Sequence, residues 1–345
     1  MSTQKAESKK RSFSIGQYSY ALIFIALFIV YYLVSSSLTW TGVTNILRHS
    51  AVIGVISFGM GLVIITGDID LSVGSMLGCV ASFGCLIFNL TNSILLTLLF
   101  CLVAGTLLGF FNGIMVGKLK LPAFIATLAT QMIYRSVAQY TCNSLPNDIK
   151  GVAGNTFKML TTDARNAMYG FGNGQILGLP TCGVIFLIIA ILMVYVTTST
   201  KYGKRLFAIG SNVKAAHMAG VNVEWNRVSV FTITGLLAGI GAFMWLAMQG
   251  NVDPATTGAS YEMYAIAAVV LGGIAMSGGR GKCVGILFGV MSYTVIDKII
   301  VAMKMNTLLN DSVKGTILIV AIIIPTMSPV IREHIHARKH RRARA

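Results

Sequence analysis

Apolar runs of roughly the length of a membrane span alternate with short polar breaks along most of the chain. A helix needs about 20 predominantly apolar residues to cross the hydrocarbon core of a bilayer. Runs that approach this length occupy residues 18–37, 51–66, 71–90, 94–116, 121–140, 183–197, 228–249, 263–276, 283–301 and 313–330. The pattern predicts an all-α polytopic membrane protein with about ten transmembrane helices, which form a single domain over residues 18–330.

The composition supports this class. Of 345 residues, 55% are hydrophobic and 11% are charged, whereas a soluble domain has roughly 25% charged residues. The 27 Lys and Arg residues outnumber the 11 Asp and Glu residues, an excess that in a soluble protein would suggest a nucleic-acid partner. Because the apolar runs leave no surface for such a partner, we expect a lipid bilayer, and no nucleic acid, around this chain.

Basic residues are concentrated at both ends of the chain and in alternate polar breaks. An even number of spans puts both termini on one side, and the positive-inside rule makes that side the cytoplasm. The N-terminal tail 1–17 and the C-terminal tail 331–345 are therefore expected in the cytoplasm. The same rule places a long loop, 141–182, outside the cell and makes 198–227 the longest cytoplasmic connection.

Glycines recur at a spacing that allows helices to approach closely in lipid, as in Gly105 with Gly109 and Gly285 with Gly289. The two stretches also read alike, GTLLGF and GILFGV. This likeness fits either a duplication of two halves, which is common in transporters, or chance.

The chain shows no signature of catalysis. It has no phosphate-binding P-loop, and its five His residues include no pair with metal-site spacing inside a fold. We therefore expect no catalytic residue, no cofactor and no metal site.

One polar break contains two carboxylates, in the stretch GDIDLSVG from Gly67 through Asp70 and Ser72 to Gly74. Carboxylates that interrupt a long apolar stretch of a membrane protein indicate a functional site by default. The interpretation favoured from the residues is a tight cytoplasmic turn in which Asp70 or Ser72 caps the next helix. For Arg135, Asp297 and Lys298, which lie within or near the ends of spans, we expect side chains that snorkel to the interface.

The connection 198–227 contains the pattern of a short helix. Asn212 is a good N-cap, residues 213–219 are compatible with a helix, and Gly220 suits the left-handed position beyond its end. Lys204 and Arg205 precede this helix, with Phe207 and Ile209 as apolar contacts. The residues alone leave two interpretations open, a helix gripped by a partner protein and a helix that lies on lipid headgroups.

Two of the six cysteines, Cys142 and Cys182, flank the long external loop. A disulfide between them would hold the base of this loop together in an oxidising environment. We treat this bridge as a hypothesis.

Four stretches together resemble the permease subunit of bacterial ABC importers for monosaccharides, of the ribose, xylose and galactose type, within the branched-chain amino acid/ribose permease superfamily. They are TGDIDLSVG (66–74), PAFIATLAT (122–130), GKRLFAIGSN with AAHMAGVNV (203–223) and AIAAVVLGGIAMSGGRG (265–281). The resemblance covers roughly residues 45–325 and implies a fold like that of type II ABC importers. It also implies a non-catalytic subunit in the bacterial inner membrane, with ATP hydrolysis by a partner.

By this resemblance, the short helix in 198–227 becomes a coupling helix that sits in a groove of the ATPase subunit. The residues implied in coupling are Gly203, Lys204, Arg205, Phe207, Ile209, Gly210, Asn212, Lys214, Ala215, Ala216 and Gly220. The sequence departs from the family where Val213 and Lys214 replace a frequent Pro-Glu pair, and where Tyr264 replaces a common acid.

The resemblance implies three protein partners, namely a dimer of ABC ATPase subunits, an external substrate-binding protein and a second permease copy, identical or similar. Segments 143–180 and 250–261 are the expected docking surfaces for the binding protein, with Lys150, Lys158, Arg165, Asp253 and Glu262 as contacts. Three alternatives remain. One is a related permease for branched-chain amino acids or nucleosides, and another is a secondary transporter, which would need buried coupling carboxylates. The third is a scaffold or receptor that transports nothing and has no ATPase partner.

Overall fold

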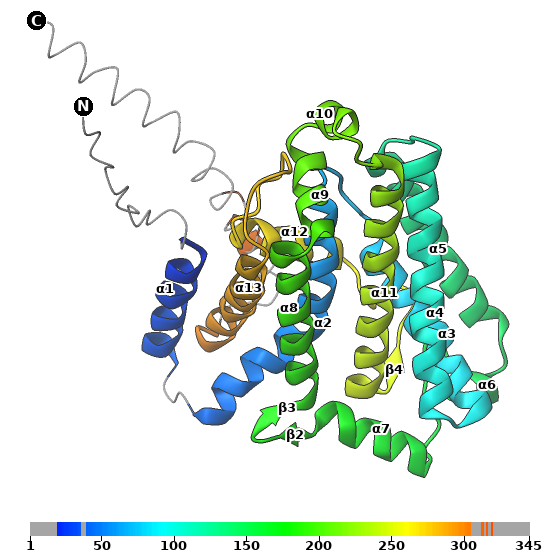
Figure 1. The fold of residues 1–345 in the computed structure, drawn as a ribbon. Helices are drawn as coiled ribbons and strands as arrows, with labels where there is room; N and C mark the ends of the chain where they lie inside the picture. The colour runs from blue at the N-terminus through cyan, green and yellow to red at the C-terminus, as the bar shows by residue number, and fades with distance from the viewer. Residues whose placement is uncertain (1–18, 36–38, 305–311, 314, 317–318, 320–345) are drawn as a thin grey trace, which may run out of the picture.

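The structure, a computed structural model, describes residues 19–35 and 39–304 and a few positions between 312 and 319. Long helices form a bundle (Figure 1). They are α1 (Ser19–Val34), α2 (Trp40–Ile65), α3 (Val73–Thr91), α4 (Ile94–Gly113) continued by the π-helix η2 (Ile114–Lys118), α5 (Ala123–Ser144), α8 (Thr181–Ser199), α11 (Val223–Gln249) and α13 (Val284–Ala302). Shorter helices are α6 (Asn147–Lys150), α7 (Asp163–Asn173), α9 (Lys201–Ser211), α10 (Val213–Met218) and α12 (Tyr261–Leu271).

Two pairs of two-residue strands complete the described fold. Strand β1 (Phe157–Lys158) pairs antiparallel with β4 (Asn251–Val252), and β2 (Gln175–Ile176) pairs antiparallel with β3 (Leu179–Pro180). Helix α10 lies at one end of the bundle and α7 lies across the opposite end, hereafter the α10 end and the α7 end (Figure 1).

The helices agree with the apolar pattern of the sequence. Among the described residues, each of the first nine apolar runs overlaps a helix, and six helices are long and apolar enough to cross a membrane. Most of the tenth run, 313–330, and both basic tails lie outside the described residues. The fold is therefore that of a helical membrane protein, and the number of ten spans stays a prediction.

Helix α2 begins at Trp40, much earlier than the expected start near residue 51. The sequence between these points contains polar residues that suggested a break, but the fold satisfies them. Arg48 donates a hydrogen bond to Asn173 of α7, and Ser50 donates one to Thr294 of α13 at 2.8 Å. Tertiary partners thus allow a polar stretch to remain helical.

Glycines bring the central helices into close contact, as their spacing predicted. A Cβ atom at Gly105 of α4 would lie 2.4 Å from the carbonyl oxygen of Gly235 in α11, and one at Gly285 of α13 would lie 1.9 Å from that of Gly272. Both positions thus depend on the absence of a side chain.

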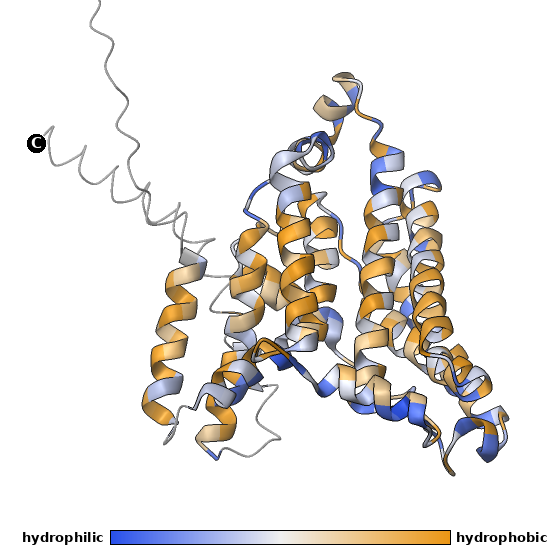
Figure 2. Cartoon of the chain, turned by 60° about the horizontal axis from the view of Figure 1, so that its bottom comes forward, coloured by the Kyte–Doolittle hydropathy of each residue, from blue (hydrophilic) through white to orange (hydrophobic). Residues whose placement is uncertain are grey.

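Exposed apolar side chains cover the outer faces of the bundle, whereas hydrophilic residues gather at its two ends (Figure 2). The exposed apolar residues on α4, α5 and α8 include Leu95, Leu99, Val103, Leu107, Phe124, Ile125, Met132, Ile133, Ile188 and Ile191. This is the surface expected of helices that face lipid.

Helix α12 is too short to cross a bilayer, since its 11 residues extend only about 16 Å at 1.5 Å per residue. The preceding segment 253–260 turns into the bundle, where a Cβ atom at Gly74 of α3 would lie 2.3 Å from the Gly258 carbonyl oxygen. Arg135 of α5 donates hydrogen bonds to the carbonyl oxygens of Pro254 and Thr257, at 3.0 and 2.6 Å. The expectation that Arg135 snorkels was therefore wrong, because its guanidinium satisfies buried irregular backbone.

Candidate functional site

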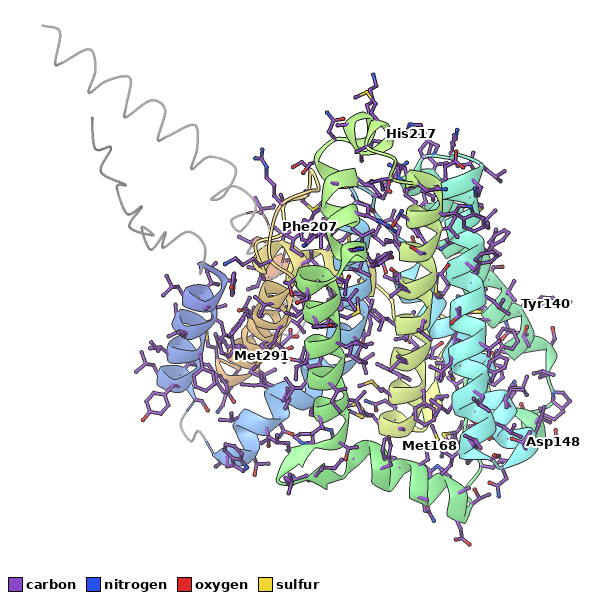
Figure 3. The ribbon with its side chains drawn as sticks, viewed as in Figure 1. Tyr140, Asp148, Met168, Phe207, His217 and Met291 are labelled. Carbon is purple, nitrogen blue, oxygen red and sulfur yellow. The ribbon has the colours of Figure 1, made fainter. Side chains whose placement is uncertain are left out.

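Helices α9 and α10 form an arm at the α10 end, with His217 near its tip (Figure 3). The Oδ1 atom of Asn212 accepts a hydrogen bond from the Ala215 N–H at 3.0 Å, and Gly220 has a φ of +79° just beyond the helix. The predicted N-cap and the predicted left-handed glycine are both confirmed. Local sequence therefore determines where the arm turns.

The arm has one buried and one exposed face. Ile209, Ala216 and Val223 form a small apolar cluster that holds α10 against the start of α11. Lys214 is exposed on the opposite face, and 82% of the Met218 surface is accessible. The arm thus offers a short, partly apolar helix beyond the ends of the long helices.

The arm is attached to the bundle at Gly210. A Cβ atom there would lie 1.9 Å from the Ile65 carbonyl oxygen at the end of α2 and 2.4 Å from the Gly279 nitrogen. Gly279, whose φ of +67° suits glycine, donates a hydrogen bond to the same Ile65 oxygen at 2.9 Å. Next to this contact, a Cβ atom at Gly278 would lie 2.9 Å from the Gly67 nitrogen. Three stretches that carried the family resemblance therefore meet at one point, hereafter the junction.

The other residues implied in coupling occupy different environments. Gly203 is buried where α9 begins, and a Cβ atom there would lie 2.3 Å from the Thr197 carbonyl oxygen of α8. Phe207 is half-buried against the main core. The exposed members of the set are Lys204, Arg205, Asn212, Lys214, Ala215 and Gly220.

A groove of about 520 Å³ lies beside α10, lined by residues of α10, η2 and the start of α11. Glu224 of α11 accepts from Lys118 at 3.1 Å and pairs with Lys120 at 3.3 Å. Because Lys118 is the last residue of η2 and Lys120 follows it, these two ion pairs link the α4–α5 connection to the base of the arm.

The signature turn lies deeper than the sequence suggested. The Asp70 side chain is fully buried, and its Oδ1 atom accepts hydrogen bonds from the Ser72 N–H at 2.8 Å and the Ser72 hydroxyl at 2.6 Å. Asn112 of α4 donates to the Ser72 hydroxyl at 2.7 Å, and the Tyr134 hydroxyl lies 3.2 Å from Asn112 Oδ1. Asp70 thus binds the N–H of Ser72, just before α3 and within the bundle. Among the described residues, no side chain caps the first turn of α3, so the capping interpretation was wrong, because the Asp70 carboxylate closes its own turn instead.

Both glycines of the signature turn have a steric role. Gly67 has a φ of +86°, and a Cβ atom at Gly74 would lie 2.5 Å from Glu262 Oε2. Beside them, the Asp68 carboxylate pairs with Arg227 of α11 at 3.0 Å. Burial raises the pKa of Asp68, and the Arg227 guanidinium opposes this shift.

Sequence analysis missed Asn112, Tyr134 and Glu224. A signal existed for Asn112, since it is a polar amide within an otherwise apolar run. Its partner Ser72 lies 40 positions away in the chain, so only the fold shows what the amide binds.

At the α7 end, the β1–β4 pair connects the two segments expected to contact a binding protein. Lys158 of β1 is exposed, and the guanidinium of Arg165 lies 6.0 Å from the ring centroid of Tyr169. Asp253 is half-buried and accepts hydrogen bonds within its own turn, from the Ala255 N–H and the Thr256 hydroxyl. Of the five expected contacts, Lys158 and Arg165 thus suit a docking surface best.

Two of the expected docking residues were assigned wrongly. Lys150 is only 4% exposed and donates to the Gly154 carbonyl oxygen at 2.7 Å, which stabilises its own loop. Glu262 is 6% exposed and faces Gln131 of α5 inside the bundle. Neither side chain is available to an external partner, because the fold uses both for internal contacts.

The hypothesis of a bridge between Cys142 and Cys182 is also corrected. Both are buried free thiols in this structure. Cys182 Sγ donates to the Gly172 carbonyl oxygen at 3.4 Å, whereas Cys142 lies near Cys85. Each thiol therefore packs as a small apolar side chain in its own part of the core.

The chain matches a protein family and many individual relatives. Residues 42–322 match the model of the family described as "Branched-chain amino acid transport system / permease component". The ribose import permease protein RbsC of Bacillus subtilis is 34% identical over 88% of this chain and 90% of its own length. RbsC of Escherichia coli is 30% identical over 94% of this chain and 98% of its own length.

A further relative, the autoinducer 2 import system permease protein LsrC of Salmonella paratyphi B, is 30% identical over 80% of this chain and 75% of its own length. No solved structure matches the chain. The chain belongs to the branched-chain amino acid transport system permease family. Its resemblance to monosaccharide importer permeases is confirmed by the ribose permeases among its relatives.

Proposed function

We propose that this chain is the membrane-spanning subunit of an ATP-driven importer for a monosaccharide, with its α10 end in the cytoplasm of a bacterial cell. The names of the ribose permeases support the substrate class. The orientation is supported by the basic residues at the α10 end, because such residues are retained on the cytoplasmic side. They are Lys118, Lys120, Lys201, Lys204, Arg205, Lys214 and Arg227.

The observation that carries this proposal is the attachment of the α9–α10 arm to the bundle. An exposed helix transmits force only if its base is fixed to the elements that must move. Gly210 packs directly on the end of α2 and on Gly279, with no side chain between the backbones. The ATPase subunit grips α10 from the cytoplasm, and the groove of about 520 Å³ beside it receives part of that contact.

The permease itself needs two states that open toward opposite sides of the membrane. When two ATPase subunits close on ATP, they displace both arms of a permease dimer. The displacement reaches α2 at Ile65, and the next residues along the chain are those of the signature turn. The buried Asp70–Ser72–Asn112 hydrogen bonds tie this turn to α4, so the movement of one arm changes the packing of several helices together.

The α7 end receives the external binding protein. Its surface combines α7 with the β1–β4 segments. Exposed Lys158 and the half-exposed Arg165 meet acidic groups of the binding protein, and such rim charges act mainly on the association rate. A second permease copy, identical or similar, completes the pathway.

The experiment is to purify the chain with its ATPase and to measure ATP hydrolysis in proteoliposomes, with and without sugar-loaded binding protein. Stimulation of hydrolysis by loaded binding protein, together with uptake of the sugar, is the expected result. Uptake that depends on an ion gradient and proceeds without any ATPase would contradict the proposal and favour a secondary transporter. Uptake of a branched-chain amino acid or a nucleoside, but of no sugar, would overturn the substrate class alone.

A further inference from the structure

A polar cavity of about 250 Å³ lies between α2, α12 and α13, away from the arm and the junction. Its wall includes the rings of Tyr261 and Tyr264 from the first turn of α12 and Tyr293 from α13. The ring centroids of Tyr264 and Tyr293 are 5.2 Å apart, and those of Tyr261 and Tyr264 are 6.0 Å apart. Three phenol rings from two helices thus form a continuous aromatic wall.

The rest of the wall carries hydrogen-bonding groups of different kinds. His49 of α2 faces the cavity together with Thr294, Asp297 and Lys298 of α13. Sequence analysis expected Asp297 and Lys298 to snorkel, but the structure places both at this cavity, half-buried. Intramembrane ionisable residues around a cavity are costly to maintain and mark a ligand or ion pathway.

Part of the cavity wall lies near the middle of a long helix, and transporters bind their substrates near the middle of the membrane. Tyr293 is near the middle of α13, which extends over Val284–Ala302, and Met291 on the same helix lies midway between the ends of the bundle (Figure 3). Helix α12 begins inside the bundle, after the inward-turned segment 253–260. Broken helices of this kind, whose irregular backbone lines a cavity, build the substrate sites of many transporters.

We infer that this cavity is a binding site for a neutral polyhydroxylated ligand, a monosaccharide, on its way through the permease. Aromatic rings offer flat apolar faces to the C–H side of a sugar ring, and carboxylate, hydroxyl and imidazole groups bind its hydroxyls. One carboxylate and one ammonium group, Asp297 and Lys298, leave the wall without a dominant charge, which suits a neutral ligand. The volume of about 250 Å³ is slightly below the range of roughly 300–1,000 Å³ that is typical for drug-sized ligands.

This inference rests on the proposed function, because it concerns the substrate of the same importer. The test uses the complete importer in proteoliposomes, with radiolabelled D-ribose as the probe. Tyr264→Ala removes one ring of the aromatic wall, and Tyr264→Phe keeps the ring but removes its hydroxyl. Tyr140→Ala is the control, because Tyr140 is 74% exposed on the outer face of α5 (Figure 3).

We expect Tyr264→Ala and Asp297→Asn each to lower the initial rate of ribose uptake about tenfold. Tyr264→Phe retains most of the uptake, and Tyr140→Ala has no effect. ATP hydrolysis stimulated by ribose-loaded binding protein stays within about twofold of that of the unaltered importer in every variant.

Unchanged uptake in Tyr264→Ala and Asp297→Asn would overturn the assignment of the cavity. An equal loss of uptake and of stimulated ATP hydrolysis would also overturn it, because it would show a merely structural role. If the unaltered importer stimulated hydrolysis but transported no sugar, the substrate class of the proposed function would fail, and the ligand named here with it.

Discussion

Replacement of Gly210 by alanine tests whether the arm drives the bundle. The new Cβ atom would lie 1.9 Å from the Ile65 carbonyl oxygen, whereas close contacts between carbon and oxygen are about 3.3 Å. The arm must therefore move away from α2 by more than about 1 Å. Overpacking of this kind costs about 1–3 kcal/mol, which corresponds to roughly 5- to 150-fold in a conformational equilibrium.

The assay measures ribose uptake and ATP hydrolysis in the same proteoliposomes, so that their ratio reports coupling. We expect Gly210→Ala to bind the ATPase, since the exposed face of α10 is unaltered, but to lower the uptake per ATP hydrolysed at least tenfold. Gly170→Ala in α7 is the matched control, because no atom lies within 4 Å of its Cβ position. Normal coupling in Gly210→Ala would refute the reasoning.

Three further predictions concern the stability of the detergent-solubilised protein, measured by thermal unfolding. Arg227→Gln lowers the free energy of unfolding by at most about 3 kcal/mol. The loss of stability is larger at pH 8 than at pH 5. Burial raises the pKa of Asp68, and above that pKa the ionised carboxylate is destabilising when Arg227 no longer pairs with it. A loss of stability that is the same at both pH values would contradict this reasoning. Asp70→Ala leaves two buried donors, the Ser72 N–H and the Ser72 hydroxyl, without an acceptor and costs about 1–3 kcal/mol for each. Asp70→Asn keeps an acceptor oxygen and should lose less stability. Equal losses in both variants would argue that the hydrogen bonds are not the cause. Gly109→Leu separates α4 from α11 and costs about 1–3 kcal/mol or more. The control Leu107→Ala, on the lipid-facing side of α4, changes stability by about 0.5 kcal/mol or less. Similar values for both variants would refute close helix packing as the cause.

Features that depend on neighbouring residues were predictable from the sequence. The cap at Asn212 and the left-handed turn at Gly220 involve contacts over a few positions, so residue type and spacing determine them. Helix positions followed from apolar runs for the same reason. The close approach of helices at Gly105 and Gly285 was also predictable from the sequence. In lipid no hydrophobic effect drives helices together, so their association depends on the close packing that small residues allow.

Features that depend on distant residues were not predictable in this way. The polar stretch before residue 51 suggested a break, because its partners Asn173 and Thr294 come from other helices. The burial of Lys150 and Glu262 likewise depends on backbone and side chains brought together by the fold. A single sequence states which groups are polar but gives no indication of which distant groups satisfy them.

The central claim, that the ATPase grips α10, is tested most directly by site-specific crosslinking. Met218→Cys places a thiol on the exposed tip of α10, and Leu177→Cys places one on a residue that is 98% exposed at the α7 end. The six native cysteines are buried, so the introduced thiol is the reactive one. A thiol-directed crosslinker is predicted to join Met218→Cys to the ATPase subunit and to leave Leu177→Cys free of it. Crosslinking of the ATPase to Leu177→Cys but not to Met218→Cys would contradict the account.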